Sequence, residues 1–369
     1  MNIDWMQLEN EAAVASPALL VYADRVEENL RRMIAIAGSP GRLRPHIKTH
    51  KLGPIVALQV RLGITKCKCA TIAEAELAAQ AGATDVLLAM QLVGPNVPRW
   101  VALTRAFPSV VFSTLVDDPR ALALYQESAV AAGITLELLV DLDVGFQRSG
   151  IAPGAQARAL YRALASAPGL RAGGLHAYDG HLQQPDRAER AQAADAGFAP
   201  VRALHAELLR EGLPVPRLVC GGTPTFPIHA LRPDVECSPG TCVLWDAGYH
   251  TKIPDLDFLN AAVLLTRVIS RPGVNRICLD LGHKAVASEM PHPRVIFPAL
   301  PEAKPVVHSE EHLVLETPRA SEFPVGSVIY GIPWHICPTT ALHDKVQIVR
   351  LGLVAEQWQV TARARQLNF

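Results

Sequence analysis

The stretch "RLRPHIKTHK", residues 42–51, carries six arginine, lysine or histidine side chains within ten positions. If it forms a strand, alternate residues point to opposite faces, and the basic side chains share one face. That face would hold Arg44, His46, Lys48 and His50. A lysine held among other cations and partly desolvated has a lowered pKa, so more of it is the neutral amine that attacks carbonyl groups. Lys48 therefore fits a lysine that forms a Schiff base.

The alternative for this stretch is a solvated basic edge, which is the usual explanation of a run of charges. The tight alternation and the lack of acidic residues between positions 29 and 73 disfavour it.

The composition excludes several classes of partner. The 369 residues contain 35 lysines plus arginines and 35 aspartates plus glutamates, so no net charge attracts nucleic acid or an anionic membrane. The N-terminus lacks the basic start of a secretory signal, and no uncharged apolar run approaches the roughly 18 residues of a membrane span. Seven cysteines without a regular interval are typical of buried thiols. We expect a cytoplasmic protein that acts on a small molecule.

From residue 18 to about residue 250, short β-rich runs alternate with longer segments of helical periodicity, close to eight βα units. This pattern predicts a (β/α)8 TIM barrel with its active site at the C-terminal ends of the strands. A doubly wound sheet would give the same pattern and is the less favoured alternative. The β-rich runs are "ALLVYA", "RLRPHIK", "KCKCA", "DVLLAM", "VVFSTLV", "LELLVDLD", "RAGGLHAY" and "RLVCGG".

After about residue 254 the helical segments end, and β-rich pieces follow with Pro and Gly between them. We therefore predict a barrel domain at 18–254 and an antiparallel β-domain at 255–369, which a segment of residues 1–17 could join.

Two Gly-containing stretches indicate a phosphate site. "CGGTP" follows the presumed last barrel strand and offers Gly221, Gly222 and Thr223, and "SPGTC" adds Gly240 and Thr241. Glycine lets backbone N–H groups approach a phosphate closely, and the late loops of a barrel are its usual phosphate site. Either stretch alone could be an ordinary turn.

Two further stretches carry side chains suited to catalysis or metal binding. "HAYDGH" ends a strand, so that His176 and Tyr178 share a face, with His181 close behind. His176 could equally be a histidine buried in the core. "PWHICP" places His335 and Cys337 two residues apart, on the same side of a strand, as a metal pair requires. Spacing alone favours chance for this pair.

"RPHIKTHK" resembles the signature of the fold-type III pyridoxal-phosphate enzymes of the D-threonine aldolase and D-serine dehydratase family. The landmarks follow the family's order over most of the chain. The resemblance implies an alanine-racemase-like barrel with a C-terminal β-domain, and pyridoxal phosphate on Lys48, not on Lys51. It also implies that His46 belongs to the cofactor site and that Arg148, in "VDLDVGFQRSGI", lies near the cofactor's phenolic oxygen.

The same resemblance places Tyr178 beside the cofactor and His181 near the substrate. It implies that His335 and Cys337 bind a divalent metal, and a thiolate with an imidazole suits Zn²⁺ better than Mn²⁺ or Mg²⁺. The His-x-Cys pair resembles the dehydratase branch. Related aldolases carry a histidine where this chain has Asp179.

These features favour a lyase that removes the β-hydroxyl group of D-β-hydroxy-α-amino acids and gives a 2-oxo acid and ammonia. The open alternative is retro-aldol cleavage to glycine and an aldehyde. The D-configuration and a head-to-tail homodimer come from the resemblance alone, and the particular amino acid is not fixed.

Three other functions are less favoured than the elimination and the retro-aldol cleavage. A racemase needs a tyrosine opposite Lys48, for which Tyr249 and Tyr330 are candidates without a recognisable motif. A pyridoxal-phosphate carrier would end with the barrel. A barrel enzyme without this cofactor would use Lys48 to form a Schiff base with its substrate.

Overall fold

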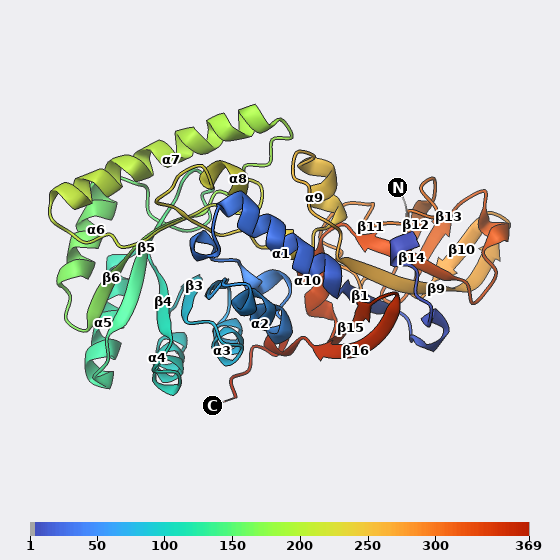
Figure 1. Cartoon of the computed structure of the whole chain (residues 1–369), viewed down its shortest axis with the longest axis horizontal. Helices are drawn as coiled ribbons and strands as arrows, with labels where there is room; N and C mark the ends of the chain where they lie inside the picture. The colour runs from blue at the N-terminus through green and yellow to red at the C-terminus, as the bar shows by residue number, and fades with distance from the viewer. Residues whose placement is uncertain (1–3, 369) are drawn as a thin grey trace. The chain divides into compact units, whose positions relative to one another are not determined.

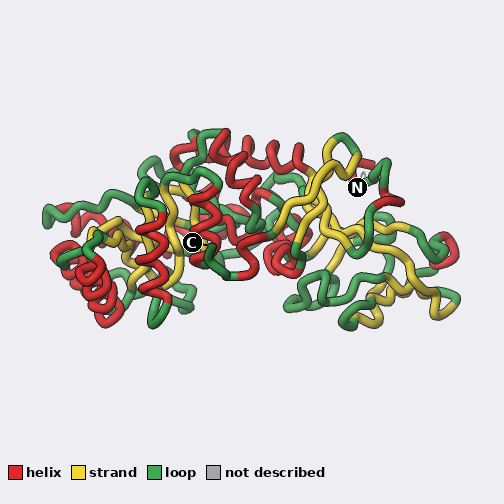
Figure 2. The backbone as a smooth tube through the Cα atoms, turned by 90° about the horizontal axis from the view of Figure 1, so that it is seen from below, coloured by secondary structure: helices red, strands yellow, loops and turns green. Residues whose placement is uncertain are grey.

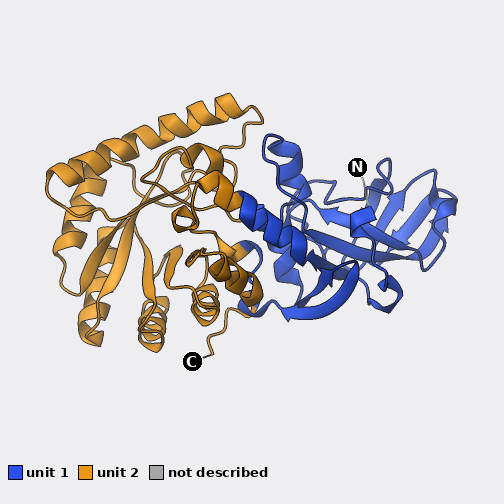
Figure 3. Ribbon diagram, viewed as in Figure 1, with its two compact units in different colours: residues 1–32, 49–52, 241–363 blue, residues 33–48, 53–240, 364–369 orange. Residues whose placement is uncertain are grey.

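The computed structural model describes residues 4–368, and the chain divides into two compact units (Figures 1 and 3). Of the described residues, 33–48, 53–240 and 364–368 form the barrel unit, and 4–32, 49–52 and 241–363 form the β unit. The division differs from the predicted boundaries at 18–32 and 241–254, which belong to the β unit. The reason is that β1 (Ala18–Tyr22) pairs with β15 (Lys345–Arg350) and β9 (Ala262–Gly273).

Seven parallel strands form the sheet of the barrel unit, in the order in which they follow one another along the chain. They are β2 (Lys66–Cys69), β3 (Asp85–Gln91), β4 (Val111–Val116), β5 (Leu136–Leu142), β6 (Leu170–Ala177), β7 (Leu218–Cys220) and β8 (Glu236–Cys237). The helix α2 (Gly53–Arg61) precedes β2. The helices between the strands are α3 (Ile72–Gln80), α4 (Asn96–Ala106), α5 (Pro119–Ala132), α6 (Ala155–Ser166), α7 (Arg187–Arg210) and α8 (Phe226–His229).

Residues 43–46 close this sheet into a ring between β8 and β2. Leu43 bridges to Cys237, and His46 bridges to Lys68. The Arg44 N–H donates to the Cys237 carbonyl at 2.9 Å, and the Lys68 N–H donates to the carbonyl of residue 45 at 2.8 Å. The eight-membered parallel ring confirms the predicted barrel. However, the prediction that "ALLVYA" is the first barrel strand is wrong, because this segment is β1, which pairs within the β unit.

The predicted strand over 43–50 is correct only to His46. The Lys48 N–H donates to His46 Nδ1 at 3.3 Å instead of to a neighbouring strand, and residues Ile47–Thr49 form a 3-10 helix. The alternation therefore fails beyond His46. Arg44 does point inward, where it is fully buried and forms ion pairs with Asp85 and Glu236, each at 2.8 Å. These carboxylates lie at the first residues of β3 and β8, so Arg44 neutralises the end of the barrel opposite the strands' C-termini.

Short polar signals set the helix starts of the barrel unit. The Thr71 side chain accepts from the Glu74 N–H at the start of α3, and Asp118 accepts from two N–H groups at the start of α5. Gly133 ends α5 in the left-handed conformation. The strands in turn bury an aliphatic core cluster inside the barrel: Leu87, Leu115, Leu139 and Val219.

The β unit is built mainly of strands, as Figure 2 shows. Its sheet runs β12-β13-β10-β9-β1-β15-β16, and β14 pairs with β9 and β11. All pairings are antiparallel except that of β1 with β15, which confirms the predicted C-terminal β-domain. The elements not yet given are β10 (Arg276–Leu279), β11 (Val295–Ile296), β12 (Lys304–His308), β13 (Leu313–Glu316), β14 (Val328–Pro333), β16 (Leu353–Gln359), α9 (Ala247–Lys252) and α10 (Ile336–Leu342), while α1 (Ala23–Ala37) runs from one unit into the other.

The N-terminal segment packs into the core of the β unit. Met6, Leu8 and Val14 are buried against strand residues of that unit, and the Tyr22 hydroxyl donates to the Met6 carbonyl at 2.5 Å. The cysteines are free thiols, and all except Cys337 are buried. Within residues 4–368, no helix has the length and apolar character needed to cross a membrane.

Candidate active site

Lys48 lies in the 3-10 helix that follows the ring-closing segment of the barrel unit. Its side chain is half-buried and has no ion-pair partner among residues 4–368. His46, two residues earlier, is buried, and its Nδ1 accepts the Lys48 backbone N–H. The lysine that the sequence singled out is therefore available at the C-terminal side of the ring.

Tyr178 forms a platform just beyond the end of β6. The Arg148 guanidinium carbon lies 4.9 Å from its ring centroid, and the Lys68 Nζ lies 5.4 Å from it. A Cβ atom at Gly222 would come within 2.9 Å of the same ring, so only glycine fits there. The structure thus brings the predicted residues Arg148, Tyr178 and Gly222 together.

His181 is held beside this platform. Its ring stacks on Phe146 with a centroid distance of 5.2 Å and an interplanar angle of 10°. Phe146 also contacts the Tyr178 ring at 5.9 Å. The buried Nδ1 atom of His181 has no hydrogen-bond partner among the described residues.

A buried Asp–His pair joins the ends of β5 and β6. Asp141 Oδ1 lies 2.7 Å from His176 Nδ1, and the other carboxylate oxygen accepts from Gln91 at 2.7 Å and from Ser149 at 3.1 Å. Burial lowers the pKa of His176 despite the neighbouring carboxylate, so the imidazole is neutral near pH 7. Its Nε2 atom is buried without a partner in the described structure. The sequence analysis missed Asp141, although its position at the end of a strand was a signal.

The predicted phosphate loop follows β7. Gly221 has φ +79°, and a Cβ atom there would lie 2.7 Å from the His229 ring, so this position requires glycine. The Gly240 N–H donates to Thr223 Oγ1 at 3.2 Å, which joins the two predicted glycine stretches within the barrel unit. Thr241 belongs to the β unit, where its hydroxyl lies 3.6 Å from Cys337 Sγ.

Asp179 stabilises this loop through contacts with Thr225 and His229. Its carboxylate accepts from the Thr225 hydroxyl at 2.6 Å and lies 2.7 Å from His229 Nε2. Thr225 Oγ1 in turn accepts the Gly222 N–H at 3.3 Å. Asp179 is buried, and its contacts are with the loop.

The predicted metal pair lies in the β unit. We predicted that the pair lies on a strand. Instead, it lies where β14 has ended, at Pro333, and α10 begins, at Ile336. His335 and Cys337 nevertheless contact each other across this junction. The His335 Nδ1 lies 2.5 Å from Glu289 Oε1, and Cys337 Sγ lies 3.1 Å from Thr49 Oγ1.

The charge around His335 favours its protonated form in the absence of metal. Burial lowers its pKa, but contacts with Cys337 and Glu289 outweigh burial and raise the pKa to about 9. A thiol beside an imidazole is a donor set that suits zinc, and a carboxylate on the second imidazole nitrogen is the usual orienting partner of a metal-binding histidine. The pair therefore fits a metal. No group of three or more potential ligands occurs among the described residues, so two protein ligands would leave coordination positions open.

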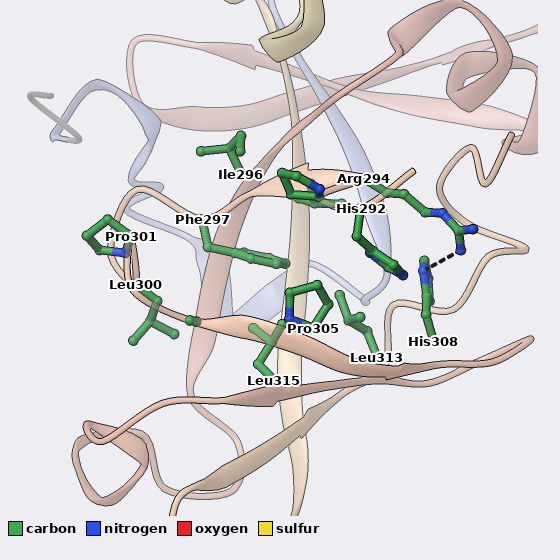
Figure 4. A pocket seen from close by; sticks show the side chains of 13 residues that line it. His292, Arg294, Ile296, Phe297, Leu300, Pro301, Pro305, His308, Leu313 and Leu315 are labelled. Atoms are coloured by element: carbon green, nitrogen blue, oxygen red, sulfur yellow. Dashed lines mark hydrogen bonds between the residues drawn. The ribbon is translucent and has the colours of Figure 1, made fainter. Parts of the chain in front are cut away.

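A second group of histidines lines a separate cavity in the β unit (Figure 4). The rings of His292 and His308 lie 5.5 Å apart, and His283 lies 6.1 Å from His308. Arg294 Nη1 lies 3.1 Å from His308 Nδ1, as the dashed line shows. Because a guanidinium can only donate, His308 Nδ1 is the acceptor of this contact. Among the described residues, no group of three or more His, Cys, Asp or Glu side chains could hold a metal ion.

The two tyrosines considered for a racemase are engaged elsewhere. The Tyr330 hydroxyl donates to Glu11 at 2.7 Å and accepts the Leu8 N–H at 3.2 Å. Burial and Glu11 raise the pKa of Tyr330, so the phenol stays protonated. The Tyr249 ring stacks on Trp245 at 5.6 Å. Neither residue is arranged as a free acid or base.

A parallel barrel with an unpaired lysine at its strand ends and a glycine loop after β7, joined to a β unit, defines the alanine-racemase-like class of pyridoxal-phosphate enzymes. The comparisons agree. The family described as alanine racemase, N-terminal domain, matches residues 21–245, and the putative serine dehydratase domain matches residues 261–349. The chain belongs to the fold-type III pyridoxal-phosphate enzymes of the D-threonine aldolase and D-serine dehydratase family, and it is a pyridoxal-phosphate-dependent lyase.

Individual relatives cover nearly the whole chain. The D-threonine aldolase of Arthrobacter sp is 32% identical over 358 residues, which are 95% of this chain and 93% of that protein. The D-threo-3-hydroxyaspartate dehydratase of Delftia sp. (strain HT23) is 26% identical over 371 residues, 93% of this chain and 96% of that protein. The crystal structure of D-threonine aldolase from Filomicrobium marinum matches with a TM-score of 0.89 and 32% identity, covering 97% of this chain and 98% of that chain. The resemblance read from the sequence is confirmed.

Proposed function

We propose that this chain eliminates the β-hydroxyl group of D-β-hydroxy-α-amino acids, with pyridoxal phosphate on Lys48 and zinc on His335 and Cys337. The products are a 2-oxo acid and ammonia. The observation that carries this choice is the pairing of a thiol with a carboxylate-oriented imidazole in the β unit. Such a pair suits zinc, a Lewis acid able to assist the departure of a hydroxyl group.

The barrel unit fits the cofactor by its donors and its shape. The Thr223 hydroxyl is the polar group that the Gly221–Gly222–Thr223 turn can turn toward a phosphate, because the Gly221 N–H donates to the Ala177 carbonyl and the Gly222 N–H to Thr225 Oγ1. A Cβ atom at Gly222 would lie within 2.9 Å of the Tyr178 ring, so glycine keeps this side of the ring open. The buried, unpartnered Nε2 of His176 provides a further polar atom for a ligand. Pyridoxal phosphate, when bound, supplies an electron sink for the bond broken at Cα.

The chain's own residues then have separate tasks. Lys48 would hold the cofactor and would then be the base for the α-proton, since no carboxylate among the described residues forms an ion pair with it. Arg148, whose guanidinium carbon lies 4.9 Å from the Tyr178 ring centroid, would bind negative charge on the cofactor. His181, held by its stack on Phe146, is the proton-transfer candidate on the substrate side.

His335 and Cys337 would hold the metal, and Glu289 would fix the imidazole so that its Nε2 faces the ion. A D-threo-3-hydroxyaspartate dehydratase has been solved as variants in which a histidine or a cysteine is replaced by alanine, the cysteine variant in a metal-free form. This supports metal dependence for the group to which we assign this chain.

Retro-aldol cleavage is the second candidate, because a relative at 32% identity is a D-threonine aldolase. The replacement of the aldolases' histidine by Asp179 does not decide between the two reactions, since Asp179 is committed to Thr225 and His229. The choice of elimination therefore depends on the metal pair.

The test is product analysis with D-threonine as substrate. The cofactor-loaded protein with Zn²⁺ should yield 2-oxobutyrate and ammonia, and a chelator or Cys337→Ala should lower the rate at least about 100-fold, as expected when a metal ligand is lost. Cys278→Ala, which removes another thiol of the β unit, is the matched control and should keep the rate. Glycine and acetaldehyde as products would establish the aldolase reaction instead.

A further inference from the structure

Lys68 is a buried lysine of the barrel unit that none of the functions assigned above explains. It lies in the middle of β2, and only 1% of its surface is exposed. Its ammonium group has no ion pair and no hydrogen bond among the described residues. It makes a cation–π contact with the face of the Tyr178 ring. Lysine is almost never fully buried unless it is paired, because a charge without a partner loses its hydration.

The carboxylates near Lys68 are committed to other groups. Asp141 binds His176, Gln91 and Ser149, and Asp179 binds Thr225 and His229. Both act on Lys68 only at longer range. Burial and the neighbouring charge of Lys48 together lower the pKa of Lys68 to about 7, against the opposite effects of Asp179, Asp141 and Cys220.

Lys66 shows how a structural lysine is accommodated on the same strand. It lies two residues before Lys68 and therefore on the same face of β2. Its ammonium group donates to Glu236 and to the Gly41 carbonyl. Lys68 has no such acceptor, and at 1% exposure its ammonium group cannot extend to water in the manner of a surface lysine. No anionic partner of Lys68 is present among residues 4–368.

We infer that Lys68 is a further cofactor-binding residue, whose ammonium group pairs with the ring oxygen of bound pyridoxal phosphate. The inference rests on the proposed function. Lys68 and Arg148 both contact the ring of Tyr178, and Lys68 bridges to His46, two residues before Lys48. The glycine loop accounts for the phosphate group of the cofactor. The phenolic oxygen is the remaining anionic atom of its ring system, and it needs cations at Tyr178.

The test compares Lys68→Met with Lys66→Met. The two variants remove the same charge from the same face of the same strand, but only the first loses the proposed contact. Apoprotein is titrated with pyridoxal phosphate and followed by protein fluorescence, and the visible absorption of the bound cofactor is then titrated with pH. Lys68→Met should bind the cofactor roughly tenfold or more weakly, as expected for one lost charge-assisted hydrogen bond.

The pH titration gives a signature that a purely structural role would not change. A nearby cation disfavours protonation of the nitrogen that links Lys48 to the cofactor, so its loss should move the midpoint of the absorption change upward by about one pH unit. Lys66→Met should leave the midpoint where it is. If Lys68→Met fails to fold, Lys68→Arg, which keeps the charge, should retain the wild-type midpoint, and Lys68→Gln should not.

The outcomes separate the two proposals. A wild-type protein that binds pyridoxal phosphate, together with Lys68 variants that share its affinity and midpoint, would overturn the role of Lys68 and leave the proposed function intact. A wild-type protein that does not bind pyridoxal phosphate would overturn both.

Discussion

The barrel unit contains two buried Asp–His pairs that have the same oxygen–nitrogen distance but different surroundings. Asp141 and His176 lie 2.7 Å apart at the ends of β5 and β6, and Asp179 and His229 lie 2.7 Å apart beneath the glycine loop. All four side chains are buried. The two pairs differ in what the second nitrogen of each imidazole contacts.

In the Asp179–His229 pair, which we call the loop pair, His229 Nδ1 lies 2.6 Å from Arg232. Arg232 in turn forms an ion pair with Asp195 near the surface. Each polar atom of that imidazole has a partner inside the protein. In the Asp141–His176 pair, the Nε2 of His176 has no partner among the described residues. A buried polar atom without a protein partner can be satisfied by a ligand or a water, whereas a fully satisfied buried network stabilises one structure. We therefore expect the Asp179–His229 pair to stabilise the loop, and we propose His176 Nε2 as a ligand contact.

The largest effect is expected from Asp179→Ala, which breaks the loop pair. It leaves the His229 imidazole and the Thr225 hydroxyl buried without their acceptor, so we expect a loss of about 3–5 kcal/mol in the free energy of unfolding. The cofactor should also bind more weakly, because Thr225 positions the Gly222 N–H. Urea unfolding of the apoprotein measures the first effect and cofactor titration the second.

Asp195→Ala is the matched control for this variant. It removes a carboxylate from the exposed end of the same network, where the side chain is 69% exposed. An exposed ion pair contributes roughly 0–1 kcal/mol, so this variant should unfold almost as the wild type does. Equal losses in the two variants would show that the loop does not depend on Asp179.

An intermediate effect distinguishes the two histidines directly. His229→Gln loses contacts at both nitrogens, and we expect the apoprotein to lose about 1–3 kcal/mol of stability. His176→Gln loses one contact in the apoprotein and should cost about 1 kcal/mol, but its affinity for pyridoxal phosphate should fall roughly tenfold. Unfolding and cofactor titration of both variants test this. A His176→Gln protein with unchanged cofactor affinity would contradict the assignment of its Nε2 to a ligand.

Local patterns were sufficient for the parts of this molecule that depend on local chemistry. Alternating β-rich and helical runs predicted the barrel, and the glycine positions predicted the loop, because Gly221 and Gly222 have no space for a Cβ atom. Lys48 was singled out by the alternation of basic residues, whereas Arg148 and the place of Tyr178 beside the cofactor were predicted only through the resemblance to the family.

Long-range pairing decided what the sequence could not. β1 reads like a barrel strand, but it pairs with β9 and β15, more than 200 residues away in the chain. The strand pattern of 43–50 is broken by a single hydrogen bond to the His46 side chain. Lys68 and the two Asp–His pairs show their significance only through which partners they have or lack in three dimensions.

The smallest expected effect is a difference between the wild type and His176→Gln in how the free energy of unfolding depends on pH. Burial, followed by the charges of Lys68 and Arg148, lowers the pKa of His176 below its usual 6.5, although Asp141 acts in the opposite direction. The unfolded chain therefore takes up a proton near pH 6.5 while the folded chain does not. Stability should fall as the pH drops from about 6.5 to the lower folded pKa, by at most about 1.4 kcal/mol per pH unit for one proton. His176→Gln has no such proton to take up, so its unfolding free energy should decline less than that of the wild type over this range. Urea unfolding of both apoproteins at several pH values measures the difference, and parallel declines would mean that the pKa of His176 is the same in the folded and the unfolded chain.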